Sequence, residues 1–368
     1  MGTAIVVGAG IGGVTAAVAL QRCGWRVTVL ERAPELGEVG AGISLWPSAV
    51  AVLAELGVQG VEKSSQPSKP AGMRRPDGRW VVAAAELGLE LPVMIHRARL
   101  HELIRSEFGP AIAVRTGYEV TKLAQDPDGV TVNDDLRADL LVAADGIRSV
   151  VRGTLYPQYQ GPRYSGFSAY RGIADLELDD GGGETWGRGQ LFGFVQLIDG
   201  RYYWYATVNR PPGQRSEPTE FATWHDPIPR LIAGSDSVLQ NDIYDLTLPL
   251  VPFAQGRIAL LGDAAYAMTP NLGRGACSAI EDAGALARHL TATSDLTQAL
   301  TAYDAERRPI TTKLVRRSRT LGRLAQTESP VLRAVRDGAF GLGGKLVALR
   351  GRKGQVEQSR RDHTPAGP

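Results

Sequence analysis

The chain has 368 residues, of which 43% are hydrophobic and 22% charged, and its formal net charge is +2. This length allows one large core or two moderate ones, and the composition is ordinary for a globular enzyme. The small net charge gives no global reason to expect a nucleic-acid partner. The charge is uneven, because residues 306–361 hold 15 Lys and Arg against 4 Asp and Glu. Such a run indicates either solvated helix faces or a basic surface that faces an acidic carrier, a membrane or a partner subunit.

The cysteines and the N-terminal residues indicate the cellular compartment in which we expect the protein. Cys23 and Cys277 are the only cysteines, and they form neither a CxxC pair nor a metal-ligand cluster. No segment approaches the roughly 18 apolar residues of a transmembrane helix, and no basic leader opens the chain. We therefore expect a soluble cytoplasmic protein with free thiols, no metal site and no stable membrane association.

The first hundred residues predict alternating strands and helices. Residues 4–8 are apolar and closed by glycine, residues 14–22 have helical spacing, and residues 26–30 form the next strand, which together make a βαβ unit. Further along, the pattern predicts helices over 48–56 and 99–107, a loop with a turn over 64–79, and a hairpin within 117–132.

The middle of the chain has a different character. Residues 161–250 are rich in Tyr, Trp, Phe and Gly with alternating polarity, which predicts antiparallel sheet, and residues 179–184 read as an acidic loop between strands. Helical composition returns at 276–290 and from 300 onward, whereas 351–368 read as a frayed or disordered tail. No internal repeat is visible.

A glycine-rich segment follows the first strand. In Gly8-x-Gly10-x-x-Gly13, the first glycine permits a tight turn, the second lets the backbone approach a pyrophosphate, and the third lets helix and strand pack closely. The following helix N-terminus offers N–H groups to phosphates. Glu31 comes about 20 residues later at the end of the second strand, where its carboxylate would accept hydrogen bonds from ribose hydroxyls. The alternative is a glycine-rich turn without a ligand.

A second glycine-rich segment lies about 250 residues further on and suggests a long cofactor that is held at both ends. Asp263 follows the apolar run 258–261, at the end of a strand where open α/β sheets bind ligands. Gly273, Gly275 and Ala276 leave room for a flat ring beside a helix start whose N–H groups stabilise negative charge. The plainer interpretation of Asp263 is a helix N-cap.

Together with three intervening motifs, these segments resemble the class A flavoprotein monooxygenases, the aromatic-hydroxylase family that includes salicylate, hydroxybenzoate and urate hydroxylases and zeaxanthin epoxidase. Residues 40–47 resemble the segment that runs beside the flavin, 96–100 a motif whose arginine approaches it, and 143–152 the Asp-Gly motif linked to FAD and NAD(P)H. The resemblance spans residues 4 to about 310. It implies that FAD contacts Gly8, Gly10, Ile11, Gly13, Glu31, Arg32, Gly42, Ile43, Ser44, Arg97, Val120, Asp145, Asp263, Pro270, Gly273, Gly275 and Ala276.

The catalytic and substrate residues are less clear from the sequence. The family often has Gln where Arg274 stands and Asn where Cys277 stands, so Arg274 is a candidate catalytic cation near the flavin or the substrate, or else a surface arginine. Tyr203 and Tyr205 share a strand face, and as candidate substrate contacts they would orient or deprotonate a substrate hydroxyl; the alternative is ordinary sheet core. Leu191 aligns with an arginine that anchors the purine in the urate branch, which favours a less polar substrate.

The resemblance implies an α/β fold with a Rossmann-like FAD-binding domain, an inserted antiparallel-sheet substrate domain and C-terminal helices. We expect the FAD-binding domain at 1–70, 95–160 and 255–300, the substrate domain at 71–94 and 161–254, a helical segment at 301–350 and a tail at 351–368.

The implied activity is that of a monooxygenase. NADH or NADPH would reduce FAD, and a C4a-hydroperoxyflavin would pass one atom of O₂ to a small aromatic or polyketide-like molecule. Epoxidation, a flavin reductase or oxidase on the same fold, and a non-catalytic flavin-binding module are the alternatives. The resemblance leaves a monomer and a homodimer open.

Overall fold

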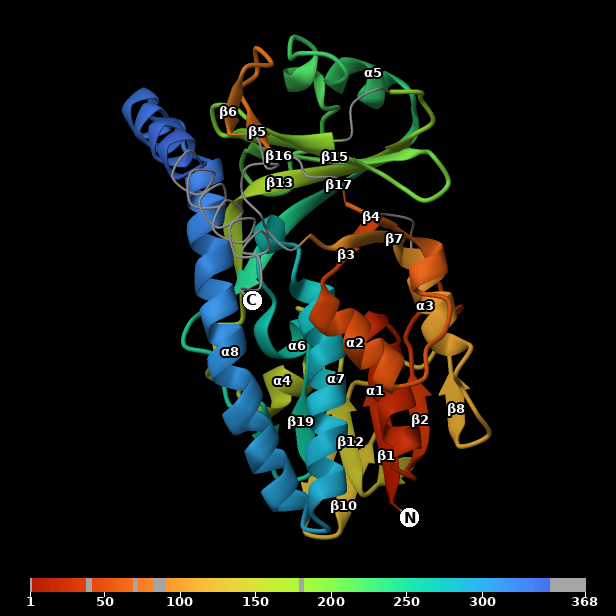
Figure 1. Ribbon diagram of the computed structural model, residues 1–368. Coiled ribbons are helices and arrows are strands. Elements are labelled where there is room, and N and C mark those ends of the chain that lie inside the picture. The colour runs from red at the N-terminus through yellow and green to blue at the C-terminus, as the bar shows by residue number, and fades with distance from the viewer. Residues whose placement is uncertain (1, 38–41, 69–71, 83–90, 179–181, 345–368) are drawn as a thin grey trace, which may run out of the picture. The chain divides into compact units, whose positions relative to one another are not determined.

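The computed structural model describes residues 2–37, 42–68, 72–82, 91–178 and 182–344 (Figure 1). Contacts within the chain divide it into two compact units. Unit 1 comprises residues 1–66, 93–166 and 242–322, and unit 2 comprises 67–92, 167–241 and 323–368. No helix in the described part of the chain is long and apolar enough to cross a membrane.

Unit 1 is built on a six-stranded sheet with the order β18-β19-β12-β1-β2-β8. All its printed pairings are parallel except that of β18 with β19. The strands are short and apolar, and successive residues of β1 and β12 are buried, so both faces of the sheet are covered. Their bounds are β1 (Thr3–Val7), β2 (Arg26–Leu30), β8 (Ile112–Arg115), β12 (Leu140–Ala143), β18 (Ala254–Gln255) and β19 (Ile258–Leu260).

Two helices, α1 (Ile11–Arg22) and α7 (Gly275–Ala292), pack against each other beside this sheet (Figure 1). The sequence predicted the start of α1 at residue 14, whereas the structure places it at Ile11 with Gly10 as N-cap. Glycines are poor helix formers, but here tertiary packing outweighs that preference. The other helices touching unit 1 are α2 (Pro47–Glu55), α3 (Arg97–Arg105), α4 (Val150–Leu155), α6 (Asp263–Tyr266) and α8 (Leu296–Ala325), with short 3₁₀ turns η1 (Glu62–Ser64) and η4 (Pro270–Leu272).

Two small sheets complete unit 1. One has the order β3-β7-β4, with β3 (Gly42–Leu45), β7 (Val93–His96) and β4 (Ser65–Pro67), and the other joins β9 (Leu123–Asp126), β10 (Gly129–Val132) and β11 (Leu136–Ala138). The hairpin predicted within 117–132 is therefore present as β9 and β10. The loop predicted over 64–79 is partly wrong, because β4 and β5 (Met73–Arg74) lie in it.

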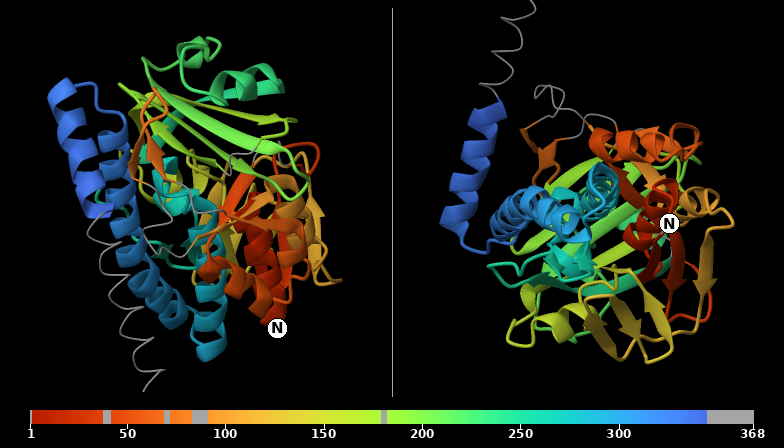
Figure 2. Two further views of the ribbon diagram at one scale, coloured as in Figure 1. Left: turned by 45° about the horizontal axis from the view of Figure 1, so that its top comes forward. Right: turned by 90° about the horizontal axis from the view of Figure 1, so that it is seen from below.

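Unit 2 is built on a seven-stranded sheet with the order β17-β13-β16-β15-β14-β5-β6. Aromatic side chains fill one face, where Trp204, Phe192 and Tyr170 are fully buried with Ile228 and Leu231 of the covering helix α5 (Ile228–Ala233) (Figure 2). The remaining bounds are β6 (Trp80–Val82), β13 (Pro162–Ala174), β14 (Gly182–Trp186), β15 (Gln190–Gln196), β16 (Tyr202–Asn209), β17 (Ser235–Leu246) and η3 (Thr219–Phe221), followed by a helix at 330–344. Residues 351–368, predicted as a tail, lie outside the described residues.

Glycines make room for aromatic rings in this sheet. A Cβ at Gly172 would lie 2.7 Å from three ring atoms of Trp204, its cross-strand neighbour. A Cβ at Gly193 would lie 2.3 Å from Cζ of Tyr205, again its cross-strand neighbour. Each ring therefore lies flat over the strand beside it, which a side chain at the glycine position would prevent.

We expect Gly172→Ala to lower the free energy of unfolding by about 1–3 kcal/mol, because the added methyl overlaps a fully buried ring. The matched control is Gly338→Ala in the helix at 330–344, where an added Cβ meets nothing within 4 Å. That change should be neutral or slightly stabilising, since alanine is the better helix former. Thermal denaturation of both variants checks this, and equal midpoints would contradict it.

Candidate active site

The turn at Gly8–Gly13 is packed so closely that its backbone leaves no room for a Cβ at Gly8 or Gly13. Gly8 has a φ of +96°, and a Cβ there would lie 2.4 Å from the carbonyl oxygen of Ala144. A Cβ at Gly13 would lie 1.9 Å from the carbonyl oxygen of Gly8. Gly10 caps α1 with extended backbone, so the first N–H groups of a 12-residue helix open at this turn. Such a helix N-terminus suits phosphate groups.

Glu31 helps to shape the same turn. Its two carboxylate oxygens accept the backbone N–H groups of Ala9 at 2.8 Å and Ala33 at 2.9 Å. Each oxygen keeps a further lone pair that can accept a ribose hydroxyl. The buried His101 of α3 contacts the carbonyl oxygen of Ala9 through Nε2 at 2.7 Å. The sequence did not single out His101, because a lone histidine in a helix looks like ordinary core. Arg32 is exposed, while Ile11 and Val120 are buried.

Asp145 and Arg152 belong to the Asp-Gly motif, and Arg152 connects this motif to the second glycine-rich segment. Asp145 Oδ2 accepts the N–H of Val151 at 3.2 Å, while the buried Oδ1 has no partner among the described residues. Burial raises the pKa of this carboxyl. The buried guanidinium of Arg152 donates to the carbonyl oxygens of Ala264 at 2.7 Å and Ile147 at 2.6 Å. Arg152 therefore fixes the two motifs to each other.

Asp263 begins α6 directly after β19. Its side chain is exposed to solvent, yet desolvation by the surrounding protein raises its pKa, with the positive charge of Arg97 acting in the opposite direction. Asp263 offers carboxyl oxygens that can accept hydrogen bonds from a ligand, and Arg97 lies near enough to affect its pKa.

The start of α7 lies against β3. Gly273 is left-handed with φ +59°, and a Cβ there would come within 3.5 Å of Ser44 Oγ. The buried Cys277 donates its thiol proton to the Ser44 carbonyl at 3.2 Å and accepts the N–H of Trp46 at 3.4 Å. Pro270 lies in η4, Gly275 and Ala276 open α7, and Gly42 and Ile43 belong to β3. Residues 40 and 41 of the predicted flavin segment lie outside the described residues.

Arg274, the N-cap of α7, is held by neighbouring side chains. Its guanidinium donates to Glu281 at 2.9 Å and lies 5.4 Å from the centre of the Trp46 ring. Glu281 also accepts from Arg307 at 3.1 Å. Arg307 in turn donates to Asp282 at 2.6 Å, so these four charges form one chain of contacts.

In unit 2, one sheet face carries the predicted substrate residues. Tyr203 and Tyr205 lie on this face with ring centroids 6.0 Å apart, and Leu191 joins them by the register of β15. The face also carries Glu184, which the sequence assigned to an acidic loop but which lies in β14. Its carboxyl accepts hydrogen bonds from Tyr205 Oη at 2.6 Å and Trp186 Nε1 at 2.8 Å.

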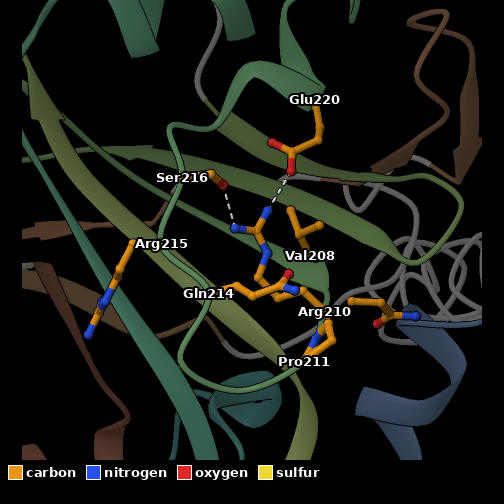
Figure 3. Close-up of a pocket in the computed structure, with 8 residues that line it drawn as sticks. Val208, Arg210, Pro211, Gln214, Arg215, Ser216 and Glu220 are labelled. Carbon is orange, nitrogen blue, oxygen red and sulfur yellow. Dashed lines mark hydrogen bonds and ion pairs between the residues drawn. The ribbon is translucent and has the colours of Figure 1, made fainter.

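An open pocket of about 470 Å³ in unit 2 is lined by residues 208–211, 214–216 and 220 (Figure 3). Arg210 is one of these lining residues, and its guanidinium donates to Glu220 and Ser216 and lies over the ring of Tyr170. The described residues contain no group of three or more His, Cys, Asp or Glu that could hold a metal ion.

The sequence and the fold match known flavoproteins. Residues 2–318 match the family model described as "FAD binding domain". The chain belongs to this family. It is 38% identical over 350 residues to the aurachin C monooxygenase/isomerase of Stigmatella aurantiaca, covering 89% of this chain and 90% of that protein. It is 33% identical over 341 residues to the 3-amino-4-hydroxybenzoate 2-monooxygenase of Streptomyces cremeus, covering 86% of each.

A solved structure gives the same result. Klebsiella pneumoniae HpxO complexed with FAD and uric acid superposes with a TM-score of 0.84 at 29% identity, and the match covers 94% of each chain. The predicted α/β fold and the predicted aromatic-hydroxylase family are therefore confirmed, and the chain is a FAD-dependent monooxygenase.

The residues of this monooxygenase fit FAD. The turn at Gly8 and Gly13 admits only backbone, as a pyrophosphate requires. The buried Oδ1 of Asp145 lacks a partner among the described residues, and Asp263 is exposed, so both carboxyl groups can accept hydrogen bonds from sugar-type hydroxyls. The small residues at the start of α7 leave its first N–H groups accessible to a flat ring.

We expect Asp263→Ala to weaken FAD binding by about tenfold to a hundredfold, the value of hydrogen bonds to a charged acceptor. Fluorescence titration of the apoprotein with FAD measures this. Asp128→Ala, in the exposed turn between β9 and β10, is the control and should leave the affinity unchanged. Equal affinities for the two variants would show that Asp263 does not hold the cofactor.

Burial should also protect Cys277 from alkylation. Desolvation raises the pKa of its thiol to about 11, so only about 0.1% is thiolate at pH 8. Cys23 is partly exposed. Iodoacetamide at pH 8 should therefore label Cys23 first in the folded protein, as read by peptide mass spectrometry. Faster labelling of Cys277 would show that its hydrogen bonds with Ser44 and Trp46 break in solution.

Proposed function

We propose that this FAD-dependent monooxygenase uses NADH or NADPH and O₂ to hydroxylate a small aromatic ring that carries an O–H or N–H group. In this proposal unit 1 holds FAD and unit 2 holds the substrate. The observation that carries it is the face with Leu191, Tyr203 and Tyr205, which combines apolar area with phenol groups. Flat apolar molecules with a few polar groups bind to such surfaces.

The relatives support this substrate class. One relative is named for a hydroxybenzoate that bears an amino group, and the HpxO structure contains uric acid. Both molecules are flat rings that carry oxygen and nitrogen. Leu191 occupies the position where the urate branch has an arginine, by the alignment made from sequence, so we propose a substrate less polar than urate. A polyketide-like aromatic compound meets these requirements.

Each part of the chain has a proposed role. The turn at Gly8–Gly13 and Glu31 bind the adenosine diphosphate part of FAD, whereas Asp263 and the start of α7 bind the ribityl chain and the ring. When bound, the flavin supplies the activation of O₂ and takes electrons from NAD(P)H. Leu191 and Tyr203 position the substrate ring. Arg274 is proposed to position Trp46 and α7, since Glu281 already neutralises its charge.

The alternatives predict different products. An epoxidase would also incorporate oxygen, but at an alkene, whereas a reductase or oxidase on this fold would incorporate none. Only the ring-hydroxylase needs the phenols of β16 to hold a ring hydroxyl.

The test is incorporation of labelled oxygen. The purified protein should be yellow, and NADH or NADPH consumption should rise several-fold with one or more members of a panel of phenols and hydroxyquinolines. With ¹⁸O₂, one labelled atom should enter the aromatic product by mass spectrometry. Reduced product without label would identify a reductase. A colourless protein that does not take up FAD would exclude a flavin-dependent reaction altogether.

A further inference from the structure

Three neighbouring strands of unit 2 place one residue each in a single row. Tyr205 of β16 pairs with Gly193 of β15, and Gly193 pairs with Glu184 of β14. Because Gly193 has no side chain, the Tyr205 ring lies over it and its hydroxyl reaches Glu184 Oε1 at 2.6 Å, two strands away. This contact depends on glycine in the middle strand, since a Cβ there would lie 2.3 Å from the ring.

The direction of this hydrogen bond limits what Tyr205 can do next. A phenol has one proton, and that proton points to the carboxylate of Glu184. The Tyr205 oxygen can therefore only accept a hydrogen bond from any further partner. A ligand group beside it has to be a donor, such as the O–H of a phenol or the N–H of a ring.

We propose that Glu184 is the terminal proton acceptor of this enzyme, and that Tyr205 passes it the proton of a donor group on the aromatic substrate. This inference rests on the proposed function, because it assumes that the substrate binds to this face. Loss of that proton makes the ring more electron-rich, which favours attack by an electrophilic oxygen.

The proton transfer balances without any further reactant. The O–H or N–H bond of the substrate breaks as a new O–H bond forms on Tyr205. The original O–H bond of Tyr205 breaks as a new one forms on Glu184 Oε1. The substrate becomes an anion and Glu184 becomes neutral, so the net charge of the site is unchanged.

The surroundings of Glu184 suit a proton acceptor. Desolvation raises its pKa, which makes it a stronger base, and the hydrogen bonds from Tyr205 and Trp186 lower the pKa and so moderate the shift. No cation among the described residues forms an ion pair with it. The charged and titratable groups around it are Tyr203 and Tyr205 on β16, Arg171 opposite Tyr205 on β13, and Arg336 with its ion-pair partner Asp337 beside Trp186.

Two probe ligands test the donor requirement. 4-Hydroxyquinoline carries a donor in either tautomer, whereas 4-methoxyquinoline carries none. We expect the FAD-loaded wild type to bind the first at least about tenfold more tightly, as read from the flavin absorbance, because the acceptor is left unpaired by the ether. Tyr205→Phe should reduce this preference to below about threefold. No binding of 4-hydroxyquinoline to the wild type, or an unchanged preference in Tyr205→Phe, would overturn the proposal.

Two variants of β14 test the proton transfer itself. In the wild type the rate of oxygen insertion should rise with pH as Glu184 becomes ionised, whereas in Glu184→Gln, which cannot take up the proton, this rise should be absent. Trp186→Phe keeps both Glu184 and Tyr205 but removes a hydrogen bond that lowers the pKa of Glu184. Glu184 then becomes ionised only at higher pH, so the rise of the rate with pH should move in the alkaline direction. A merely structural role for Glu184 predicts no such shift, and an unchanged profile in both variants would refute the relay.

The two proposals fail in different ways. If the wild type incorporates no ¹⁸O from O₂ with any substrate of the panel, the proposed hydroxylase function fails. If the wild type incorporates label and Glu184→Gln does so at the same rate and with the same pH profile, only the proton relay fails. With a functional relay, the Glu184→Gln rate should fall by about a hundredfold, the usual contribution of a positioned acid or base.

Discussion

The close approach of bare backbone at Gly8, Gly12 and Gly13 is the constraint on which unit 1 depends. Gly8 touches the end of β12 at Ala144, and Gly13 touches the Gly8 carbonyl. A Cβ at Gly12 would lie 2.9 Å from Leu261 Cδ1, just before the second glycine-rich segment. Segments that are far apart in sequence therefore meet where side chains are missing. A single methyl in this turn would move α1 away from the sheet and from α7, and with it the N–H groups that face a phosphate.

A buried charge network holds the other side of this arrangement. Asp282 of α7 accepts the N–H of Gly262 at 3.0 Å, the guanidinium of Arg307 at 2.6 Å and the hydroxyl of Tyr266. A buried ion pair contributes little net stability, but removing one partner leaves an uncompensated charge that costs about 3–5 kcal/mol. Gly262 has a φ of +58°, so this network fixes the backbone immediately before Asp263. The position of Asp263, which we propose contacts FAD, is thus set by buried side chains.

The sequence predicted those parts of the fold that depend on local patterns. The strands at residues 4–8 and 26–30 have apolar runs closed by glycine or charge, and both lie in the parallel sheet. The sequence-based prediction failed for strands that form only because they pair with residues distant in sequence. The strand β4 has three residues and β5 has two, so they carry no periodicity of their own and exist only through their partners. Glu184 followed an acidic, glycine-rich run and was assigned to a loop, although pairing with β15 places it in a sheet.

The same reasoning applies to single site residues. The glycines and Asp263 were proposed from the sequence because they lie in short motifs with a characteristic spacing along the chain. The contacts of His101, Arg152 and Cys277 were not, since each depends on a backbone atom that is distant in sequence or held by tertiary packing. Cys277 illustrates the point: its thiol both donates and accepts, as the side chain of Asn can, and this explains physically how either residue can connect α7 to β3.

Arg274 shows why a residue type alone does not define a role. A cation at a helix N-terminus opposes the positive end of the helix dipole and would be unfavourable by itself. Here Glu281, two turns along α7, takes up that charge, while Asp282 takes up the charge of Arg307. The four residues together carry no net charge. We therefore propose that any stabilisation of negative charge at the start of α7 comes from the backbone N–H groups of Gly275 and Ala276, while the guanidinium of Arg274 contacts Trp46.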